Sequence, residues 1–258
     1  MSHARGFDLS DRVALVTGAS RGLGAAIAVA LAEAGASIIA WARHRPGLTR
    51  LERTLRAHGT PVLTQLVDVT KPRVIRHALI HARKQFPRLD VLVNNAAIWA
   101  GDPLITLTSK TWHAVLESDL TSVFLVSQAV APTMIRQGYG KIITISSTSA
   151  FLAHLDGGPY CAAKAGVVHL TRVMAREWGP HGIRVNSIAP GLFRTDMTAD
   201  VFEDHRWIAR RQQQVPLRRF GEPQDLGGLA VFLASAASDY VTGQTIVIDG
   251  GALLATSS

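Results

Sequence analysis

Short apolar runs alternate with helix-like stretches along almost the whole chain. The runs are rich in Val, Ile and Leu, which is typical of strands buried on both faces of a sheet. The stretches between them repeat apolar residues every three or four positions, as amphipathic helices do. The pattern predicts strands over 13–17, 37–41, 61–68, 89–95, 141–147, 183–190 and 244–250. It predicts helices over 22–34, 46–58, 71–86, 111–137, 159–179 and 223–235.

This regular order of strand and helix predicts an α/β fold with a doubly wound, seven-stranded parallel sheet flanked by helices. We expect one domain over residues 1–258, because single α/β domains of this length are common. The polar segment 192–217 contains no predicted strand, so we expect a small helical flap there. Ligands of such sheets bind beyond the carboxyl ends of the strands, and candidate chemistry is sought at that edge.

The composition argues against several classes of protein. The chain has 27 Lys and Arg against 19 Asp and Glu, a formal net charge of +8. Many basic residues recur at helical spacing, as in 46–58, and no nucleic-acid motif accompanies them, so we expect no nucleic-acid partner. No apolar run approaches the roughly 20 residues of a membrane span, MSHARGFDLS lacks a signal core, and Cys161 is the lone cysteine. We therefore expect a cytoplasmic protein without a membrane segment, a disulfide or a metal site.

A glycine-rich segment, TGASRGLG, follows the first predicted strand and leads into a helix. Glycines there permit a tight turn and let backbone N–H groups at the helix N-terminus approach a pyrophosphate. In this strand–turn–helix context the pattern predicts dinucleotide binding rather than a simple turn. The residues expected to contact the dinucleotide are Gly18, Ser20, Arg21, Gly22, Leu23 and Gly24.

The end of the second predicted strand indicates which dinucleotide binds. An acidic residue there would accept a hydrogen bond from a ribose hydroxyl and would repel a 2′-phosphate. The sequence AWARHR at 40–45 contains no acid, and Arg21 and Arg43 suit a phosphate through their charge and geometry. We expect NADP(H) rather than NAD(H), the alternative being that both arginines are simply solvated.

Tyr160 and Lys164 lie four residues apart in a predicted helix, so their side chains share one face. Ser147 ends a predicted strand at the ligand-binding edge. A phenol could exchange a proton with a substrate oxygen while hydride moves at carbon, if its pKa of about 10 were lowered. A neighbouring ammonium would lower that pKa. Taken alone, such a pair is more often a surface contact, so the surrounding motifs decide.

Taken together, the motifs resemble those of the short-chain dehydrogenase/reductase family over residues 11–251. The matching pieces are TGASRGLG, VDVT with Asp68, NNAA at 94–97, ISS at 145–147, YCAAK at 160–164, the N-x-I-x-P-G of 186–191, and TGQTIVIDGG. Within the family the chain is similar to 3-oxoacyl-acyl-carrier-protein reductases and to glucose or ribitol dehydrogenases. The resemblance implies a Rossmann-like fold and hydride transfer between NADP(H) and an alcohol or carbonyl carbon.

The resemblance also implies residue roles. Ser147 would polarise the substrate oxygen, Tyr160 would exchange its proton, and Lys164 would lower the Tyr160 pKa and hold the nicotinamide ribose. Gly18, Gly22 and Gly24 would line the pyrophosphate. Further cofactor contacts would be Asp68 and Val69 at the adenine, Asn95 and Ala96 near the ribose, and Pro190, Gly191 and Thr195 near the carboxamide. A homotetramer or homodimer would form through helices 111–137 and 159–179 and through the C-terminal strand region.

Two positions depart from the family pattern. The family usually has Asn in the helix before the catalytic strand, as the fourth member of a proton relay, and this chain has Asp119. Asp keeps an acceptor oxygen but loses the amide donor, and its charge would alter the surroundings of Lys164. Ala97 replaces the more usual glycine of NNAG.

The substrate is the most open question at this stage. Residues 150–158 and the flap should select it, with Ser147, His154, Phe193 and Met197 as expected contacts. The motifs fit a reductase of ketones or 3-oxoacyl groups, and they fit a sugar, polyol or sugar-acid dehydrogenase equally well. Flap arginines at 206, 210 and 211 would suit an anionic substrate. A non-catalytic nucleotide-binding scaffold or sensor is the alternative of another class.

Overall fold

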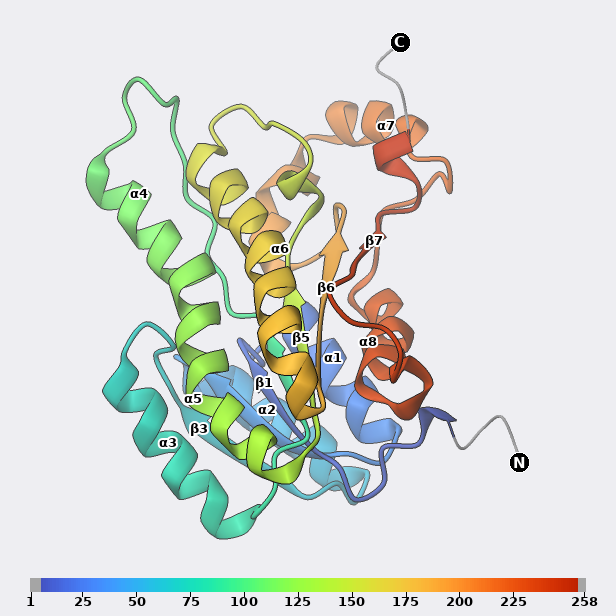
Figure 1. Cartoon of the computed structure of the whole chain (residues 1–258). Coiled ribbons are helices and arrows are strands. Elements are labelled where there is room, and N and C mark those ends of the chain that lie inside the picture. Colours follow the sequence, from blue (N-terminus) through green and yellow to red (C-terminus); the bar gives the residue numbers. More distant parts are fainter. Residues whose placement is uncertain (1–5, 255–258) are drawn as a thin grey trace.

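The computed structural model describes residues 6–254 and contains a seven-stranded parallel sheet (Figure 1). The strand order is β3-β2-β1-β4-β5-β6-β7, and every neighbouring pair is parallel. The strands are β1 (Val13–Thr17), β2 (Ser37–Ala42), β3 (Val62–Leu66), β4 (Val91–Asn94), β5 (Gly140–Ile145), β6 (Ile183–Pro190) and β7 (Thr245–Ile248). The predicted doubly wound α/β fold is thus confirmed.

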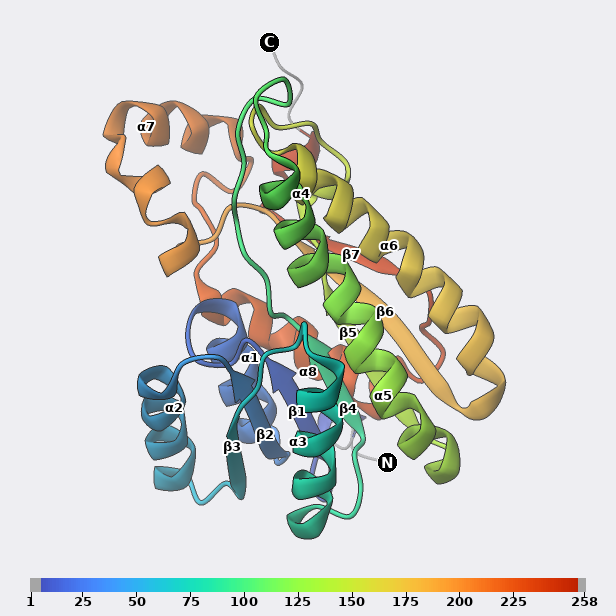
Figure 2. The same cartoon turned by 90° about the vertical axis from the view of Figure 1, so that its left-hand side faces the viewer.

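Helices cover both faces of the sheet (Figure 1, Figure 2). The first layer contains α1 (Gly22–Glu33), α2 (Arg45–Ala57) and α8 (Gly227–Ala234). The second contains α3 (Pro72–Gln85), α4 (Ser109–Leu116), α5 (Ser122–Gln137) and α6 (Gly158–Trp178). Side chains alternate along a strand, so Val16 of β1 enters the first core while Leu15 enters the second.

Helices α4 and α5 join through a π-helical turn, Glu117–Thr121, into one continuous helix. By length and composition alone this helix could cross a membrane. The sequence analysis did not predict this, because it considered only uninterrupted apolar runs. However, 44% of its most apolar window is buried inside the molecule, and α5 contacts α3, α6, β4 and β5. We therefore interpret it as a core helix of the second layer.

The segment after β6 forms the expected helical flap beyond the carboxyl ends of the strands (Figure 1). It contains two short 3₁₀ turns and α7 (His205–Gln214). Other 3₁₀ turns include Thr148–Ala150, Gly179–His181, Pro223–Leu226, Ala236–Ser238 and Ala252–Leu254, and the two turns of the flap are Asp196–Thr198 and Asp200–Glu203.

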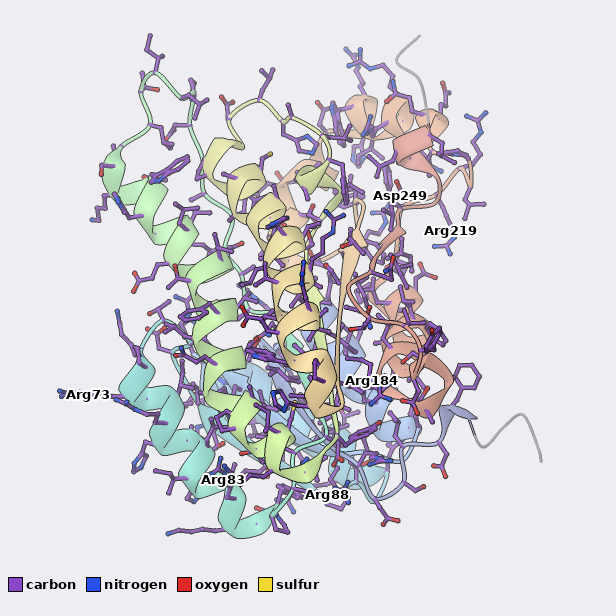
Figure 3. All side chains as sticks on the ribbon, in the orientation of Figure 1. Arg73, Arg83, Arg88, Arg184, Arg219 and Asp249 are labelled. Carbon is purple, nitrogen blue, oxygen red and sulfur yellow. The ribbon has the colours of Figure 1, made fainter. Side chains whose placement is uncertain are left out.

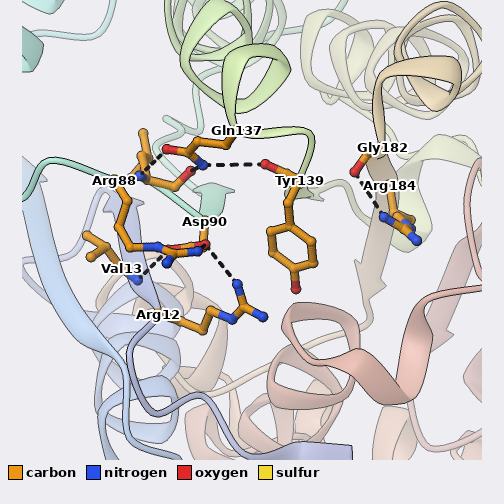
Figure 4. Close-up of polar contacts among 9 residues, drawn as sticks. Arg12, Val13, Arg88, Asp90, Gln137, Tyr139, Gly182 and Arg184 are labelled. Carbon is orange, nitrogen blue, oxygen red and sulfur yellow. Dashed lines mark hydrogen bonds and ion pairs between the residues drawn. The ribbon is translucent and has the colours of Figure 1, made fainter.

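Polar side chains join the elements at the opposite, amino end of the sheet (Figure 4). The fully buried carboxylate of Asp90 accepts hydrogen bonds from Arg12 at 3.1 Å, from Arg88 at 2.6 and 2.7 Å, and from the backbone N–H of Val13 at 3.0 Å. The Gln137 side chain accepts from the backbone N–H of residue 89 at 3.0 Å and donates to its carbonyl at 2.9 Å. These contacts tie β1, β4 and the end of α5 together, away from the ligand-binding edge.

The surplus basic residues are distributed over several elements rather than gathered on one. Figure 3 shows Arg73 and Arg83 on α3, Arg88 and Arg184 toward the amino end of the sheet, and Arg219 beside the flap. Three of these arginines form ion pairs, Arg88 with Asp90, Arg184 with Asp239 and Arg219 with Asp225.

Candidate active site

A groove lies at the carboxyl ends of β1, β2, β4, β5 and β6, where the strand order reverses between β1 and β4. Reversal points of this kind are the usual ligand sites of doubly wound sheets. The structure brings nearly all of the expected cofactor residues together on this groove. They are Gly18, Ser20, Arg21, Gly22, Leu23, Arg43, Asp68, Val69, Asn95, Ala96, Tyr160, Lys164, Pro190, Gly191 and Thr195.

The glycine loop leaves room and hydrogen-bond donors for an anion. Gly18 and Gly22 have φ angles of +65° and +55°, in the left-handed region that favours glycine. A Cβ atom on Gly18 would lie 2.8 Å from the Asn95 amide nitrogen and 2.9 Å from the Ala96 Cα. Helix α1 begins without a side-chain cap and has no acid in its first turn, so its first N–H groups are available to a phosphate.

Gly24 is not among the residues that line the groove, and its expected contact with the pyrophosphate stays a prediction. A Cβ at this position would lie 2.5 Å from the Gly18 carbonyl oxygen. The Asn95 amide blocks the same space, and it donates to the carbonyl oxygens of Thr17 at 3.0 Å and Gly18 at 3.2 Å. Gly24 therefore allows α1 to approach the loop closely.

The adenine end of the groove carries both candidate phosphate ligands. Arg43 and Arg21 line it, and Arg21 is also 3.4 Å from the exposed carboxylate of Asp196. Asp68 accepts hydrogen bonds from the Thr70 backbone N–H at 3.0 Å and hydroxyl at 2.8 Å. Burial acts to raise the pKa of Asp68, but these hydrogen bonds bring it below its usual value.

Ser147, Tyr160 and Lys164 meet at the inner end of the same groove. Ser147 directly follows β5, and its Oγ accepts a hydrogen bond from the Ser149 N–H at 3.1 Å. Lys164 is buried, and its ammonium donates to the Ile145 carbonyl at 3.2 Å. The Lys164 Nζ lies 5.3 Å from the centre of the Tyr160 ring, so the helical spacing of four does place the two side chains in contact.

The protonation of Tyr160 differs from the sequence prediction. Burial raises the pKa of Tyr160 above its ordinary value of 10.0, because an uncharged phenol is favoured away from water. The charge of Lys164 is the strongest influence that lowers this pKa, and the hydrogen bond of Ser147 lowers it further. The expected direction is therefore wrong for the ligand-free chain, although the influence of Lys164 has the predicted sign.

Asp119 lies in the π-helical turn and is fully buried. Its Oδ1 accepts a hydrogen bond from the Ile98 backbone N–H at 2.9 Å. Its Oδ2 lies 3.4 Å from the Lys164 Nζ, in ionic contact but without hydrogen-bond geometry. Burial raises the pKa of Asp119, and the charge of Lys164 acts to lower it.

A second cleft of about 840 Å³ opens between the groove and the flap. Three of the expected substrate contacts, Ser147, His154 and Met197, line it. Phe193 is 4% exposed and lines the cofactor groove rather than this cleft, so its expected substrate contact stays a prediction. Burial, and then the charge of Arg211, lower the pKa of His154, which favours a neutral imidazole in the cleft.

Comparison with known proteins identifies the family. A family model described as enoyl-(acyl carrier protein) reductase matches residues 18–252. The chain belongs to the short-chain dehydrogenase/reductase family. It is accordingly an oxidoreductase of that family, as its motifs predicted.

Relatives within the family differ in substrate. The chain is 39% identical to gluconate 5-dehydrogenase of Gluconobacter oxydans, over 97% of this chain and 98% of the relative. It is also 39% identical to 3-oxoacyl-[acyl-carrier-protein] reductase of Escherichia coli, over 95% of this chain and 98% of the relative. A gluconate 5-dehydrogenase from Burkholderia cenocepacia, solved in complex with NADP and tartrate, has a TM-score of 0.95 and 38% identity, covering 99% of this chain and 100% of that one.

The sequence analysis did not identify some of the residues that line this short-chain dehydrogenase/reductase site. Trp99 lines the substrate cleft and contacts Tyr160 edge-to-face, with ring centroids 5.0 Å apart. Its place just after β4, at the carboxyl edge, was the available signal. Thr70 and His44 also line the cofactor groove. Thr70 ends the VDVT motif, from which only Asp68 and Val69 were selected, and His44 follows the selected Arg43.

Proposed function

We propose that this chain interconverts an alcohol and a carbonyl compound with NADP(H), and that Tyr160 exchanges the proton at the substrate oxygen. One observation supports this above the others. Ser147 and Tyr160 border both the cofactor groove and the substrate cleft. A substrate in the cleft would therefore meet the phenol and the serine hydroxyl beside the cofactor, as proton transfer coupled to hydride transfer requires.

The residues have separate tasks in this proposal. Bound NADP(H) supplies or accepts the hydride. Ser147 donates a hydrogen bond to the substrate oxygen, and Tyr160 gives that oxygen a proton during reduction or takes one during oxidation. Lys164 stabilises the deprotonated phenol through its charge, and Asp119 acts on Lys164. Trp99 covers one side of the phenol and limits its contact with water.

The preference for NADP(H) over NAD(H) rests on charge at the adenine end. Arg21 and Arg43 line the groove there, and no acid follows β2 to repel a 2′-phosphate. The uncapped start of α1 suits the pyrophosphate. The related structure from Burkholderia cenocepacia, with NADP bound, supports the same choice.

A ketone or 3-oxoacyl group is the first candidate substrate, and a sugar acid is the second. Arg210 and Arg211 line the substrate cleft, and neither forms an ion pair with any residue in the described range 6–254. Unpaired guanidinium groups in a cleft favour a carboxylate ligand. Arg206, the third flap arginine, does not line the cleft. The gluconate dehydrogenase among the relatives and the tartrate bound to another support the sugar acid.

We also propose a homotetramer, or a homodimer, working in the cytoplasm. Exposed apolar side chains on α5 and α6 support the first interface, since Phe124 is 43% exposed and Val173 40% exposed. Val247 on β7 and Leu254 beyond it are exposed at the proposed second interface. Light scattering at several protein concentrations tests the assembly.

The deciding experiment combines a substrate panel with one hydroxyl deletion. Ketones, 3-oxoacyl thioesters and aldonates are assayed with NADPH or NADP⁺ and with NADH or NAD⁺, by nicotinamide absorbance. Tyr160→Phe should lower turnover about 100-fold or more while NADPH still binds. Tyr240→Phe, at a fully exposed tyrosine, is the matched control. Undiminished turnover by Tyr160→Phe would refute the role of the phenol. If the chain were a non-catalytic sensor, the unmodified protein would turn over none of these substrates.

A further inference from the structure

Asp119 places a negative charge where the family pattern has a neutral amide. The carboxylate is fully buried, and the π-helical turn brings it against α6. Its Oδ1 is occupied by the Ile98 N–H, a bond that an asparagine oxygen could accept equally well. Its Oδ2 has no hydrogen-bond partner within residues 6–254 and lies 3.4 Å from the Lys164 ammonium. The second oxygen is therefore the feature that distinguishes this chain from an asparagine-bearing one.

A buried carboxylate without water needs a compensating charge. Lys164 is the only basic residue within ion-pair distance of Asp119 among residues 6–254, and the Lys164 side chain is itself 3% exposed. The other contact of that ammonium is the neutral Ile145 carbonyl. The pair therefore shares one dry environment, in which each charge strongly affects a neighbouring titratable group.

We propose that Asp119 is a positioning residue that holds Lys164 in a buried ion pair and so makes Tyr160 a weaker acid than an asparagine at this position would. The inference rests on the proposed function of Tyr160 as the proton-exchanging group. Its consequence is that alcohol oxidation by this chain requires a more alkaline medium than oxidation by the Asp119→Asn variant. Carbonyl reduction, which needs the protonated phenol, is favoured over a wider pH range.

The groups around the phenol support this direction. From α6, Lys164 acts to lower the pKa of Tyr160 and Cys161 acts to raise it. From the π-helical turn, the charge of Asp119 raises the same pKa, and from the end of β5 the Ser147 hydroxyl lowers it. Replacing Asp119 by Asn removes one raising influence and leaves the charge of Lys164 without an opposing partner. The phenol should then deprotonate at lower pH.

A direct test titrates the phenol without any turnover. The chain has three tyrosines, 139, 160 and 240, so ring-labelled protein gives few NMR signals, and Tyr160→Phe identifies the one that matters. In ligand-free protein, Asp119→Asn should lower the midpoint of Tyr160 deprotonation by about one pH unit, the size typical of one close buried charge. Glu117→Gln is the matched control, because Glu117 lies in the same turn but is exposed and pairs with Lys71 at 3.6 Å. It should leave the midpoint unchanged.

A second arm measures the pH profile of kcat/KM for alcohol oxidation. The acidic limb should move to lower pH by the same amount in Asp119→Asn and stay in place in Glu117→Gln. An unshifted Tyr160 midpoint in a folded Asp119→Asn variant would overturn the inference, because it would mean that Asp119 is uncharged or does not act on the phenol. If no alcohol is turned over by the unmodified chain, the proposed function fails, while the NMR titration still decides the inference.

Discussion

Removing the Asp90 carboxylate should destabilise the fold strongly while leaving the chemistry intact. The carboxylate is fully buried and accepts four hydrogen bonds, three from Arg12 and Arg88 and one from the Val13 N–H. The two arginine side chains are 31% and 45% exposed, so water can replace much of what they lose. The Val13 N–H is buried and has no such replacement, which costs about 1–3 kcal/mol.

These contributions give an expected loss of about 3 kcal/mol in the free energy of unfolding for Asp90→Ala. The value lies at the lower end of the roughly 3–5 kcal/mol seen when one partner of a buried ion pair is removed, because the arginines reach solvent. Asp90→Asn keeps an oxygen for the Val13 N–H and should lose only about 1 kcal/mol. The difference between the two variants isolates the backbone hydrogen bond from the charge.

Urea unfolding at fixed protein concentration measures both variants, since assembly would make the midpoint depend on concentration. Turnover should stay unchanged, because Asp90 precedes β4 at the amino end of the sheet (Figure 4). Tyr160 lines the groove at the carboxyl ends of the strands. Equal losses in the two variants would refute the argument from the N–H group. A loss below about 1 kcal/mol for Asp90→Ala would show that the network contributes little to stability.

Two further predictions concern the ligand-binding edge. Gly24→Ala should weaken NADPH binding about 10-fold and lower the free energy of unfolding by about 1–3 kcal/mol, because the added methyl group forces α1 away from the glycine loop. Fluorescence binding and unfolding assays measure both effects, and Gly179→Ala is the control because a Cβ there meets open space. Replacing both Arg210 and Arg211 by Gln should raise the KM for an aldonate about 10-fold and leave the KM for a neutral ketone unchanged. Arg206→Gln, the control, should change neither KM. An equal rise in KM for both substrates would exclude a carboxylate contact.

The sequence predicted the sheet well because its strands are buried on both faces. The predicted strands 13–17 and 183–190 match β1 and β6 at both ends. The edge strand predicted over 61–68 is shorter in the structure, Val62–Leu66, and its side chains are only partly buried. The pattern of apolar residues locates the ends of a strand accurately where both of its faces are buried. It locates them least accurately where one face is exposed to solvent.

The site was predictable where a sequence motif determines the backbone conformation. It was less predictable where side-chain packing determines a residue's contacts. Positive φ angles and an uncapped helix follow directly from the glycine loop. The sequence did not show that Phe193 packs against Gly221, because an apolar flap residue fits a substrate contact and a packing contact equally well. The π-helical turn at Glu117–Thr121 was missed because one extra residue barely alters the apolar period of a long helix.

The two ends of the sheet differ in how completely their polar groups are paired, and this difference locates the function. At the amino end, Asp90 has partners for both carboxylate oxygens. At the carboxyl end, α1 starts without a side-chain cap, and the buried Asp119 Oδ2 lacks a hydrogen-bond partner among residues 6–254. Folding does not favour incomplete pairing of this kind, because unsatisfied polar groups cost free energy. Its concentration on one edge is expected if a dinucleotide and a polar substrate complete the pairing there.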